Sequence, residues 1–409
     1  MTTQIEPGAG VELDELRALE TNVANARDSF VADLERLVKT DCGSYTKTGV
    51  DWVGRWTADF LRGQGASVET RPHDSLGDSV IGTFEGRAGA GPRVLLIGHL
   101  DTVFDEGTAA ARPFRIADGR AYGPGVTDMK SGLLAGLYAI AALRDVLGEL
   151  PFERLVYIAN PDEEIGSVSS RPHIREFASG SDVCLVLECA RANGDIVSAR
   201  KGIVDLRLTV HGRAAHAGVE PEKGRNAIVE AARLTRDLAA LNGRWPEVTV
   251  NVGVIAGGTR PNVVPELCTL EVDVRATGRA ELEAAEAEIG ALTRAAAVPD
   301  TSVEIAEMGR HWPMEKLERS GRLVEHAQAV ARRLGFDIRD VVTGGASDAN
   351  TTAGMGVPTI DGLGPIGGND HSPAEYLEVD SIVPRTTLLA GLLLAIARDP
   401  VIAGWRKGS

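Results

Sequence analysis

Three short apolar runs constrain the fold of this chain more than any other feature. They lie at 93–98, 154–159 and 182–187, and none of them alternates with polar residues. Such runs are typical of strands that are buried on both faces of a sheet. Helical patterns at 133–147 and 169–177 separate the three runs. The order strand, helix, strand, helix, strand predicts parallel βαβ units in an α/β domain, with a mixed sheet and helices on both faces.

A different pattern begins near residue 202. Up to residue 310, alternating strands and amphipathic helices follow one another in the order βαββαβ. That order predicts a ferredoxin-like α+β domain, in which an antiparallel sheet carries helices on one side. The expected strands are 204–211, 248–255, 267–274 and 302–306, and the expected helices are 226–241 and 280–296.

The α/β pattern returns after residue 310. We therefore predict that 1–201 and 311–409 form the larger domain and that 202–310 is inserted in it. The N-terminus, of which Met1 to Leu19 is acidic, is expected to be a polar tail. The other elements expected in the larger domain are helices at 25–65 (interrupted near 39–44), 317–334 and 381–397, and a strand at 357–360.

The composition argues against several classes of partner. The chain has 409 residues, enough for two domains, and its net charge of -15 makes nucleic acid and anionic membranes poor partners. We expect no apolar stretch of the ~18 residues that a membrane span needs, and the acidic N-terminus does not resemble a secretion signal. The four cysteines form no CxxC pair, so we expect a cytoplasmic protein with reduced thiols.

Histidine and acidic side chains follow the predicted strands at their carboxyl ends or lie in adjoining loops. Asp128 precedes the helix at 133–147, and His371 lies in a glycine-rich loop. In open α/β sheets ligands bind beyond the carboxyl ends of the strands, so we expect these side chains to converge there. In chain order they are His99, Asp101, Asp128, Glu163, Glu164, Glu188 and His371.

Two histidines and three carboxylates form a ligand set that suits Zn²⁺, and less exclusively Mn²⁺ or Co²⁺. Five ligands are more than one tetrahedral site with an open position needs, but they fit two metal ions that share a carboxylate. Taken singly, each residue has a plainer interpretation, because a lone histidine is usually structural and acidic pairs after strands usually cap helices. Five such residues at strand ends and adjoining loops favour a metal-dependent hydrolase.

Six stretches of the chain match the motifs of a known family, in the family's order. On these motifs the chain resembles the M20 family of co-catalytic zinc metallopeptidases, most closely its glutamate carboxypeptidase branch. The resemblance covers nearly the whole length, and the first and third stretches together are its most specific part. The six stretches are Gly98–Val103, Ala121–Lys130, Asp162–Ser167, Leu187–Glu188, Ala215–Gly218 and the loop around His371.

The resemblance implies a role for each candidate metal ligand. Asp128 would bridge two Zn²⁺ ions, and a non-proline cis peptide would follow it. His99 and Glu188 would complete one metal site. Glu164 and His371 would complete the other.

The resemblance also implies residues that act beside the metal ions. Glu163 would be the general base, and Asp101 would orient the ring of His99. His216, taken alone, reads as a surface histidine. The motif around it makes it the histidine of a lid domain, which donates to the oxyanion and reaches the partner's active site in dimeric members. We therefore expect a homodimer through the inserted lid domain.

Three further residues would bind the substrate if the resemblance holds. Arg275 would bind the free α-carboxylate, a bidentate interaction suited to a guanidinium group. Asn262 would help to hold either that carboxylate or the oxyanion, and Ser347 would line the pocket. The stretch 194–198 lacks the basic residue that glutamate-releasing members carry, so the released residue could be aspartate or an uncharged amino acid.

The predicted activity is therefore release of a C-terminal amino acid from an N-acyl amino acid or short peptide. A related deacylase of short N-acyl amino acids is the first alternative. A catalytically silent binding protein is the second, and it is disfavoured because Glu163 and all five ligands are present. A nucleotide-binding enzyme is disfavoured because the chain has neither GxGxxG after a strand nor GxxxxGK[ST].

Overall fold

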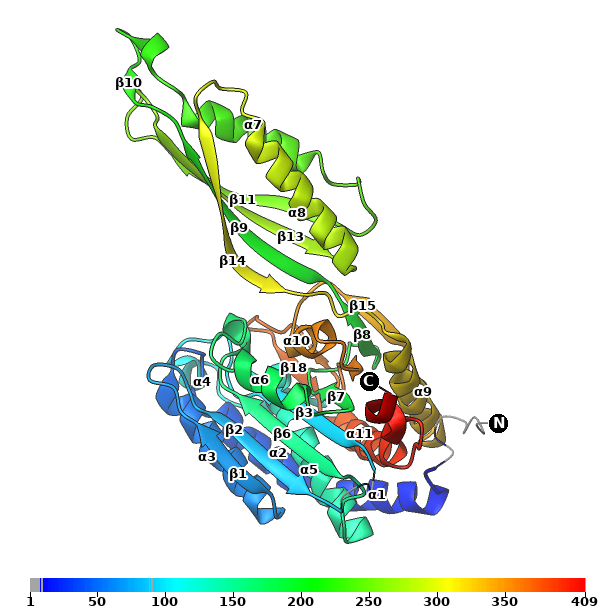
Figure 1. Cartoon of the computed structure of the whole chain (residues 1–409). Helices are drawn as coiled ribbons and strands as arrows, with labels where there is room; N and C mark the ends of the chain where they lie inside the picture. Colours follow the sequence, from blue (N-terminus) through cyan, green and yellow to red (C-terminus); the bar gives the residue numbers. More distant parts are fainter. Residues whose placement is uncertain (1–7, 9, 88, 90, 409) are drawn as a thin grey trace. The chain divides into compact units, whose positions relative to one another are not determined.

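The computed structural model describes residues 8–408, apart from residues 9, 88 and 90 (Figure 1). The chain divides into two compact units. The first unit comprises 1–198, 316–342 and 347–409, and the second comprises 199–315 and 343–346. The second unit contains the predicted insertion at 202–310 and extends beyond it at both ends.

A six-stranded mixed sheet forms the centre of the first unit. Its strands, in the order in which they lie side by side, are β1 (Ser67–Arg71), β2 (Ser79–Glu85), β6 (Arg154–Asn160), β3 (Arg93–His99), β7 (Val183–Val186) and β16 (Thr359–Ile360). The strands from β6 to β16 are parallel, whereas β1 and β2 form an antiparallel edge. The predicted mixed sheet is confirmed, and the three apolar runs are β3, β6 and β7.

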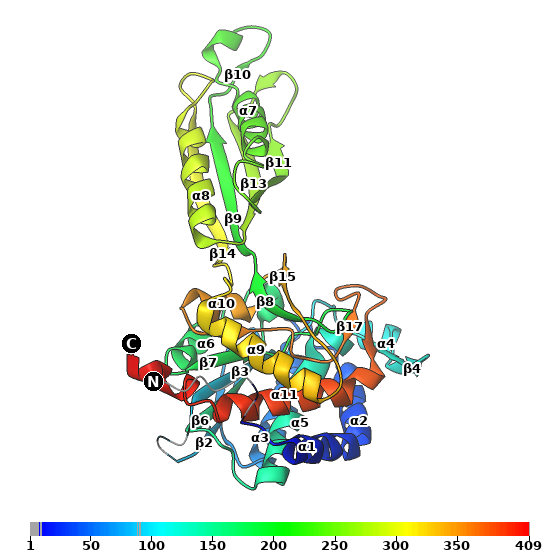
Figure 2. The same cartoon turned by 90° about the vertical axis from the view of Figure 1, so that its right-hand side faces the viewer.

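Helices lie on both sides of this sheet (Figure 2). The predicted helical stretch at 25–65 forms two separate helices, with the break between Val38 and Lys47. The helices are α2 (Arg27–Val38), α3 (Lys47–Gly63), α4 (Thr108–Ala111), α5 (Ser131–Leu147), α6 (Arg171–Ala178), α9 (Glu318–Arg333), α10 (Asp348–Gly354) and α11 (Ile382–Ala397).

The helix α1 (Leu13–Asn25) corrects the expectation of a polar N-terminal tail. Its sequence is rich in charge, but three apolar residues recur at helical spacing and form a buried stripe. The stripe packs against α5 and α11. Its buried residues are Leu16, Leu19 and Val23.

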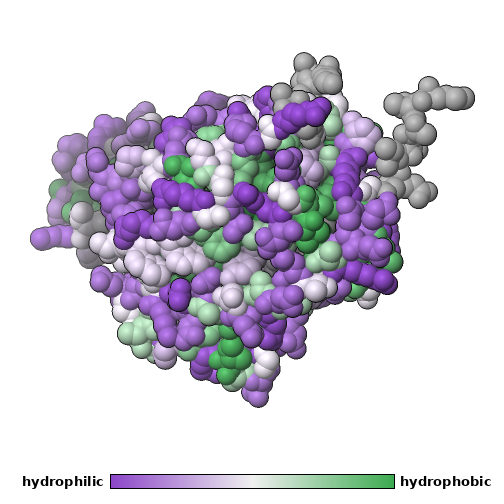
Figure 3. All heavy atoms as spheres, turned by 90° about the horizontal axis from the view of Figure 1, so that it is seen from below, coloured by the Kyte–Doolittle hydropathy of each residue, from purple (hydrophilic) through white to green (hydrophobic). Residues whose placement is uncertain are grey.

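Two helical segments are, by length and composition alone, long and apolar enough to cross a membrane. This finding corrects the expectation that the chain has no apolar stretch of that length. They are Val126–Leu147, which includes α5, and Val379–Ala397, which includes α11. The structure buries 94% and 83% of their apolar windows, and α5 packs against α11. Both are therefore core helices of the first unit. On the face shown in Figure 3, hydrophobic residues form small patches among hydrophilic ones.

A small four-stranded sheet joins parts of the first unit that are far apart in sequence. Its strands lie in the order β17 (Gly367–Gly368), β18 (Tyr376–Glu378), β5 (Arg120–Tyr122) and β4 (Arg115–Ala117). The sequence analysis did not predict this sheet. Because β5 precedes the loop that holds Asp128 and β17 precedes the loop that holds His371, the pairing of β18 with its neighbours brings the two loops together.

The second unit is an antiparallel sheet with helices on one side (Figure 1). Its strands lie in the order β11 (Thr249–Gly257), β13 (Leu267–Ala276), β9 (Gly202–His211) and β14 (Ser302–His311). The helices α7 (Ala227–Ala239) and α8 (Arg279–Arg294) pack on this sheet around a separate apolar core. This is the predicted ferredoxin-like arrangement. A two-stranded ribbon, β10 (Ala215–His216) with β12 (Val263–Val264), extends from the unit.

The last pair of strands, β8 (Ile196–Arg200) and β15 (Asp340–Thr343), lies where the chain passes between the units. Neither strand was predicted, because both are short and carry charged residues among the apolar ones.

Candidate metal centre

Two groups of side chains that could each hold a metal ion share Asp128 in the first unit. In one group, Nε2 of His99 lies 3.1 Å from Oδ1 of Asp128 and 3.7 Å from Oε1 of Glu188. In the other, Nε2 of His371 lies 3.1 Å from Oδ2 of Asp128 and 3.1 Å from Oε2 of Glu164. Within each group, the candidate ligand atoms lie within 4.8 Å of one another. Because the two oxygens of Asp128 face different groups, this carboxylate is placed to bridge two metal sites.

The loop before α5 gives Asp128 its position. A cis peptide joins Asp128 to Met129, as the resemblance implied. The buried carboxylate of Glu375 accepts hydrogen bonds from the backbone N–H groups of Gly125, Thr127 and Asp128, at 2.8, 2.9 and 3.1 Å. Burial raises the pKa of Glu375 to about 7, although these three donors favour its charged form.

Glu375 is a functional candidate that the sequence analysis missed. It lies four residues after His371 and therefore ties the two metal-binding loops to each other. The only sequence signal was a carboxylate inside a glycine- and proline-containing loop, which also fits a solvated surface residue.

Asp101 contacts the ring of His99 and the backbone of Glu163 and Glu164. The Nδ1 of His99 lies 3.0 Å from the carbonyl oxygen of Asp101 and 3.3 Å from its Oδ1. The carboxylate of Asp101 also accepts from the backbone N–H groups of Glu163 and Glu164, each at 3.2 Å, and from the hydroxyl of Ser44 at 2.6 Å. With Nδ1 donating to Asp101, Nε2 of His99 is the ring nitrogen available to a metal ion.

The electrostatics of the centre favour a bound cation. Hydrogen bonds to Asp128 and Glu164 raise the pKa of His371 to about 11. Burial would lower the pKa of His99, but its bonds to Asp101 and Asp128 raise it well above the usual value. The neighbouring carboxylates thus stabilise positive charge at the rings of His99 and His371.

Glu164 provides a direct test of whether a metal ion fits. Its Oε1 is buried and has no hydrogen-bond partner within the described residues. A buried, unpaired carboxylate oxygen is costly unless a cation compensates it. The donor set and this oxygen together fit divalent metal ions in both groups.

Glu163 lies beside the two groups without being a member of either. Burial, and then the charge of Glu188, raise the pKa of its carboxyl group well above the usual value. No group in the described part of the chain donates a hydrogen bond to this carboxylate. Glu163 is therefore a candidate for proton transfer at this centre.

His216 ends the strand β10 of the ribbon in the second unit, and Asn262 immediately precedes its strand β12. His216 is exposed, and its Nδ1 accepts from the backbone N–H of Gly218 at 3.1 Å. The neutral ring therefore carries its proton on Nε2, where it can donate. The carbonyl oxygen of Asn262 accepts from the N–H of Ala217 at 3.0 Å, which keeps the two strands of the ribbon in register.

The two other predicted substrate residues are already engaged in contacts. Arg275 is paired with Asp273 on β13. Ser347 is buried in the first unit, where its hydroxyl caps α10 and donates to Asp361 at 2.7 Å. The substrate roles of His216, Asn262, Arg275 and Ser347 stay predictions.

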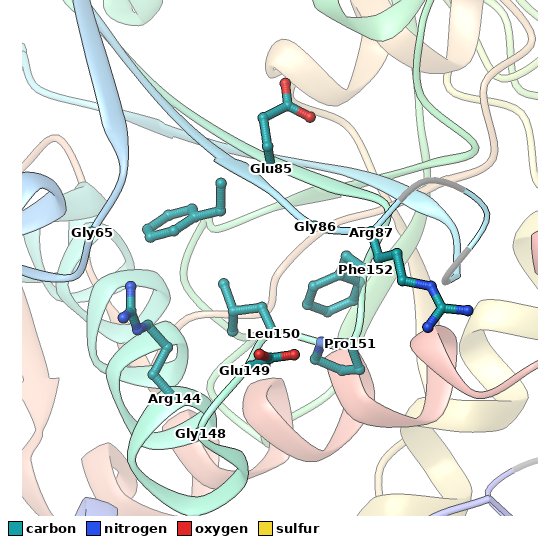
Figure 4. A pocket seen from close by; sticks show the side chains of 11 residues that line it. Gly65, Glu85, Gly86, Arg87, Arg144, Gly148, Glu149, Leu150, Pro151 and Phe152 are labelled. Carbon is teal, nitrogen blue, oxygen red and sulfur yellow. The ribbon is translucent and has the colours of Figure 1, made fainter.

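A cavity of about 770 Å³ lies at the opposite end of the central sheet from the metal centre (Figure 4). Its lining includes Glu85, which ends β2, and Phe152, which precedes β6. The metal-binding Glu164 follows the other end of β6. None of the predicted site residues lines this cavity, so it is separate from the candidate centre.

Comparisons with known proteins agree with the resemblance noted in the sequence. Residues 95–395 match the model of peptidase family M20/M25/M40. The chain is 30% identical to carboxypeptidase G2 from a Pseudomonas species, over 90% of this chain and 89% of that one. It is 29% identical to an acetylornithine deacetylase from Edwardsiella ictaluri, over 89% and 97% of the two chains.

The fold also resembles solved structures. The crystal structure of aminopeptidase PepT from Bacillus cereus superposes with a TM-score of 0.75 at 23% identity, and covers 91% of this chain and 99% of that one. At this level of identity the similarity concerns the fold alone.

Proposed function

Because the chain belongs to peptidase family M20/M25/M40, and is a hydrolase of that family, we propose that it is a dinuclear zinc amidohydrolase. It cleaves the amide bond of an N-acyl amino acid or short peptide and releases the C-terminal amino acid. The observation that carries this proposal is Asp128, whose two oxygens face two separate histidine–carboxylate groups.

Two Zn²⁺ ions fit the donor set, with Co²⁺ or Mn²⁺ as possible substitutes. His99 and Glu188 would hold one ion and Glu164 and His371 the other, with Asp128 between them. When bound, the ions polarise the scissile carbonyl group and lower the pKa of the attacking water.

The chain's own residues then move the protons. Glu163 accepts the proton of the attacking water and passes it to the leaving amine. Asp101 keeps His99 in the correct orientation and holds the backbone of Glu163 and Glu164 in place. The single residue Asp101 therefore positions the proton acceptor Glu163 relative to the ligands His99 and Glu164.

The second unit supplies the substrate contacts in this proposal. Nε2–H of His216 donates to the oxyanion, a role that the hydrogen bond from Gly218 to Nδ1 supports. Arg275 binds the α-carboxylate, and Asn262 assists it. Ser347 lines the pocket through its backbone and the surface of α10, because its hydroxyl is engaged.

The released residue is aspartate or an uncharged amino acid in this proposal. The stretch 194–198 has no basic residue, and Asp195 accepts from the backbone N–H of Arg339 at 2.8 Å instead of facing a ligand. A deacylase of short N-acyl amino acids is the alternative, favoured by the similarity to an acetylornithine deacetylase. A silent binding protein is disfavoured, because the five ligands converge and Glu163 lies beside them.

We also propose that the protein is a cytoplasmic homodimer. The strand β11 is an edge of its sheet, and Val254 and Ile255 on it are exposed, as are Ile228 and Val229 on the neighbouring helix α7. An exposed edge strand with apolar side chains is suited to pairing with a second copy. The four cysteines are buried and free, which suits a reducing compartment.

A hydrolysis assay tests the proposed chemistry. The purified protein would be given a panel of N-acyl amino acids with Asp, Glu, Ala, Phe or Lys as the released residue, with acetyl and benzoyl acyl groups. We expect amino acid release that EDTA abolishes, that Zn²⁺ restores and that Glu163→Ala lacks. Absence of release across the panel by protein carrying two metal ions would contradict the proposal. Exclusive use of acetyl substrates would favour the deacylase.

A further inference from the structure

The protein holds the guanidinium group of Arg275 along one edge. Nε of Arg275 donates to the two oxygens of Asp273 at 2.9 and 3.1 Å, and Nη2 donates to Oδ2 of Asp273 at 3.0 Å. The two residues lie two positions apart on β13, so their side chains leave the sheet on the same face. On the other side of the group, Nη1 donates to the carbonyl oxygen of Gly344 at 3.1 Å.

These contacts leave a particular part of Arg275 available. A guanidinium group has five N–H donors in a plane. Asp273 takes the side edge, formed by Nε–H and one N–H of Nη2, and Gly344 takes one N–H of Nη1. The remaining donors are one N–H on each Nη, and both lie away from the edge that Asp273 occupies. Two such donors can bind the two oxygens of a carboxylate.

Asp273 occupies a position that the sheet itself does not favour. In the register of β9 and β13, Asp273 lies directly opposite Asp205. Like charges that face each other across two strands destabilise a sheet. Burial, and then the charge of Asp273, raise the pKa of Asp205 above its usual value. Sheet stability therefore does not account for a second carboxylate at position 273, whereas the orientation of Arg275 does.

We propose that Asp273 is a positioning residue, which binds the side edge of Arg275 and directs the end of the guanidinium group toward the substrate. The ligand is one planar carboxylate, the α-carboxylate of the substrate, bound by the two remaining N–H donors, one on each Nη. This inference rests on the proposed function, in which Arg275 binds that carboxylate.

Positioning and simple charge effects predict opposite results for a substitution of Asp273. As an anion beside an anion-binding group, Asp273 should weaken carboxylate binding by its charge alone, so its neutralisation should lower KM. If Asp273 orients Arg275, its neutralisation should raise KM. Asp205 carries the same charge opposite Asp273 but has no hydrogen bond to Arg275 within the described residues, so Asp205→Asn is the matched control.

The test measures KM and kcat for the N-acyl amino acid that the panel identifies and for its α-carboxamide. We expect Asp273→Asn to raise KM for the acid about tenfold, with kcat and the KM for the amide nearly unchanged. Asp205→Asn should leave KM for the acid unchanged or lower it. Unchanged or lowered KM in Asp273→Asn, or an equal rise for acid and amide, would overturn the inference.

Arg275→Ala separates failure of this inference from failure of the proposed function. If Arg275→Ala raises KM for the acid but not for the amide, while Asp273→Asn does neither, only the positioning role is wrong. If Arg275→Ala affects acid and amide equally, Arg275 does not bind the carboxylate. Should Asp273→Asn fail to fold in a thermal unfolding control, Asp273→Ser is the second variant, with the same expected rise.

Discussion

The candidate metal ligands of the first unit and the proposed substrate residues of the second unit are held in different ways. His99 is buried and Asp128 is largely buried, and each is fixed by a second carboxylate, Asp101 or Glu375. His216 is exposed at the end of a two-stranded ribbon, and one backbone N–H fixes its ring. The proposed chemistry thus depends on a group of carboxylates connected by hydrogen bonds, whereas the proposed substrate contact of His216 comes from an exposed side chain.

Because of this difference, we expect substitutions in the two regions to have different effects. Removing a carboxylate from the first unit leaves buried donors or rings unpaired, which affects metal binding as a whole. Removing a side chain from the surface of the second unit deletes one contact and disturbs little else. The four predictions below test this contrast, from the largest expected effect to the smallest.

The largest effect is expected for Glu163, which lies in the first unit but is not a ligand. Glu163→Gln should lower kcat by about 10²–10⁴-fold, because proton transfer is lost, and it should leave the metal content unchanged. Steady-state kinetics and elemental analysis of the same preparation would check both parts. Loss of metal together with activity would show that Glu163 belongs to the ligand group.

A loss of about 10²–10³-fold in kcat is expected for His216→Ala, because one oxyanion donor is removed. Metal content and thermal stability should not change, since His216 is exposed. His211→Ala is the matched control, because His211 is also an exposed histidine of the second unit and pairs with Glu304. Equal effects of the two substitutions on kcat would contradict a role of His216 in catalysis.

Glu375→Gln should weaken metal binding about 10–100-fold, because the side chain that fixes the Asp128 loop loses its charge. The affinity can be measured by competition with a chelator. Glu378→Gln is the control, since Glu378 is a nearby carboxylate that pairs with Arg120. If Glu375→Gln retains the affinity of the unchanged protein, the backbone alone positions Asp128.

The smallest effect is expected for Ser347. Ser347→Ala removes a helix cap and a hydrogen bond to Asp361, so it should lower the free energy of unfolding by about 1–2 kcal/mol. Its effect on KM should be smaller than that of Arg275→Ala. Chemical denaturation and kinetics would separate the two, with Ser347→Thr as the control that keeps the hydroxyl. A large change in KM without loss of stability would assign Ser347 to substrate binding.

The sequence was sufficient to predict the parallel part of the central sheet and the ferredoxin-like unit. In both, burial imposes a simple pattern: continuous apolar runs in β3, β6 and β7, and alternation in β9 and β13. Elements with mixed exposure escaped prediction. The edge strand β1 is largely exposed and polar, and α1 has only three buried residues, so neither leaves a strong pattern.

His99, Glu164 and Glu188 were predictable for the same physical reason, since they follow parallel strands whose carboxyl ends meet at one edge. Asp128 and His371 lie in loops that the small antiparallel sheet brings together, and that sheet was not predicted.

The supporting residues were not predictable. Glu375 acts through a loop on a short sheet, and Asp101 reaches Ser44 across 57 positions of sequence. Such contacts depend on tertiary structure that no local pattern encodes. Asp273 was visible in the sequence only as a neighbour of Arg275, and the hydrogen bonds gave it a role.

The central claim is that Asp128 joins two metal sites, and the metal content of the purified protein tests it most directly. After dialysis against Zn²⁺ and removal of excess metal, we predict two Zn²⁺ ions per chain, and one in His371→Ala. One ion per chain in the unchanged protein, or two in His371→Ala, would contradict a dinuclear centre built on Asp128.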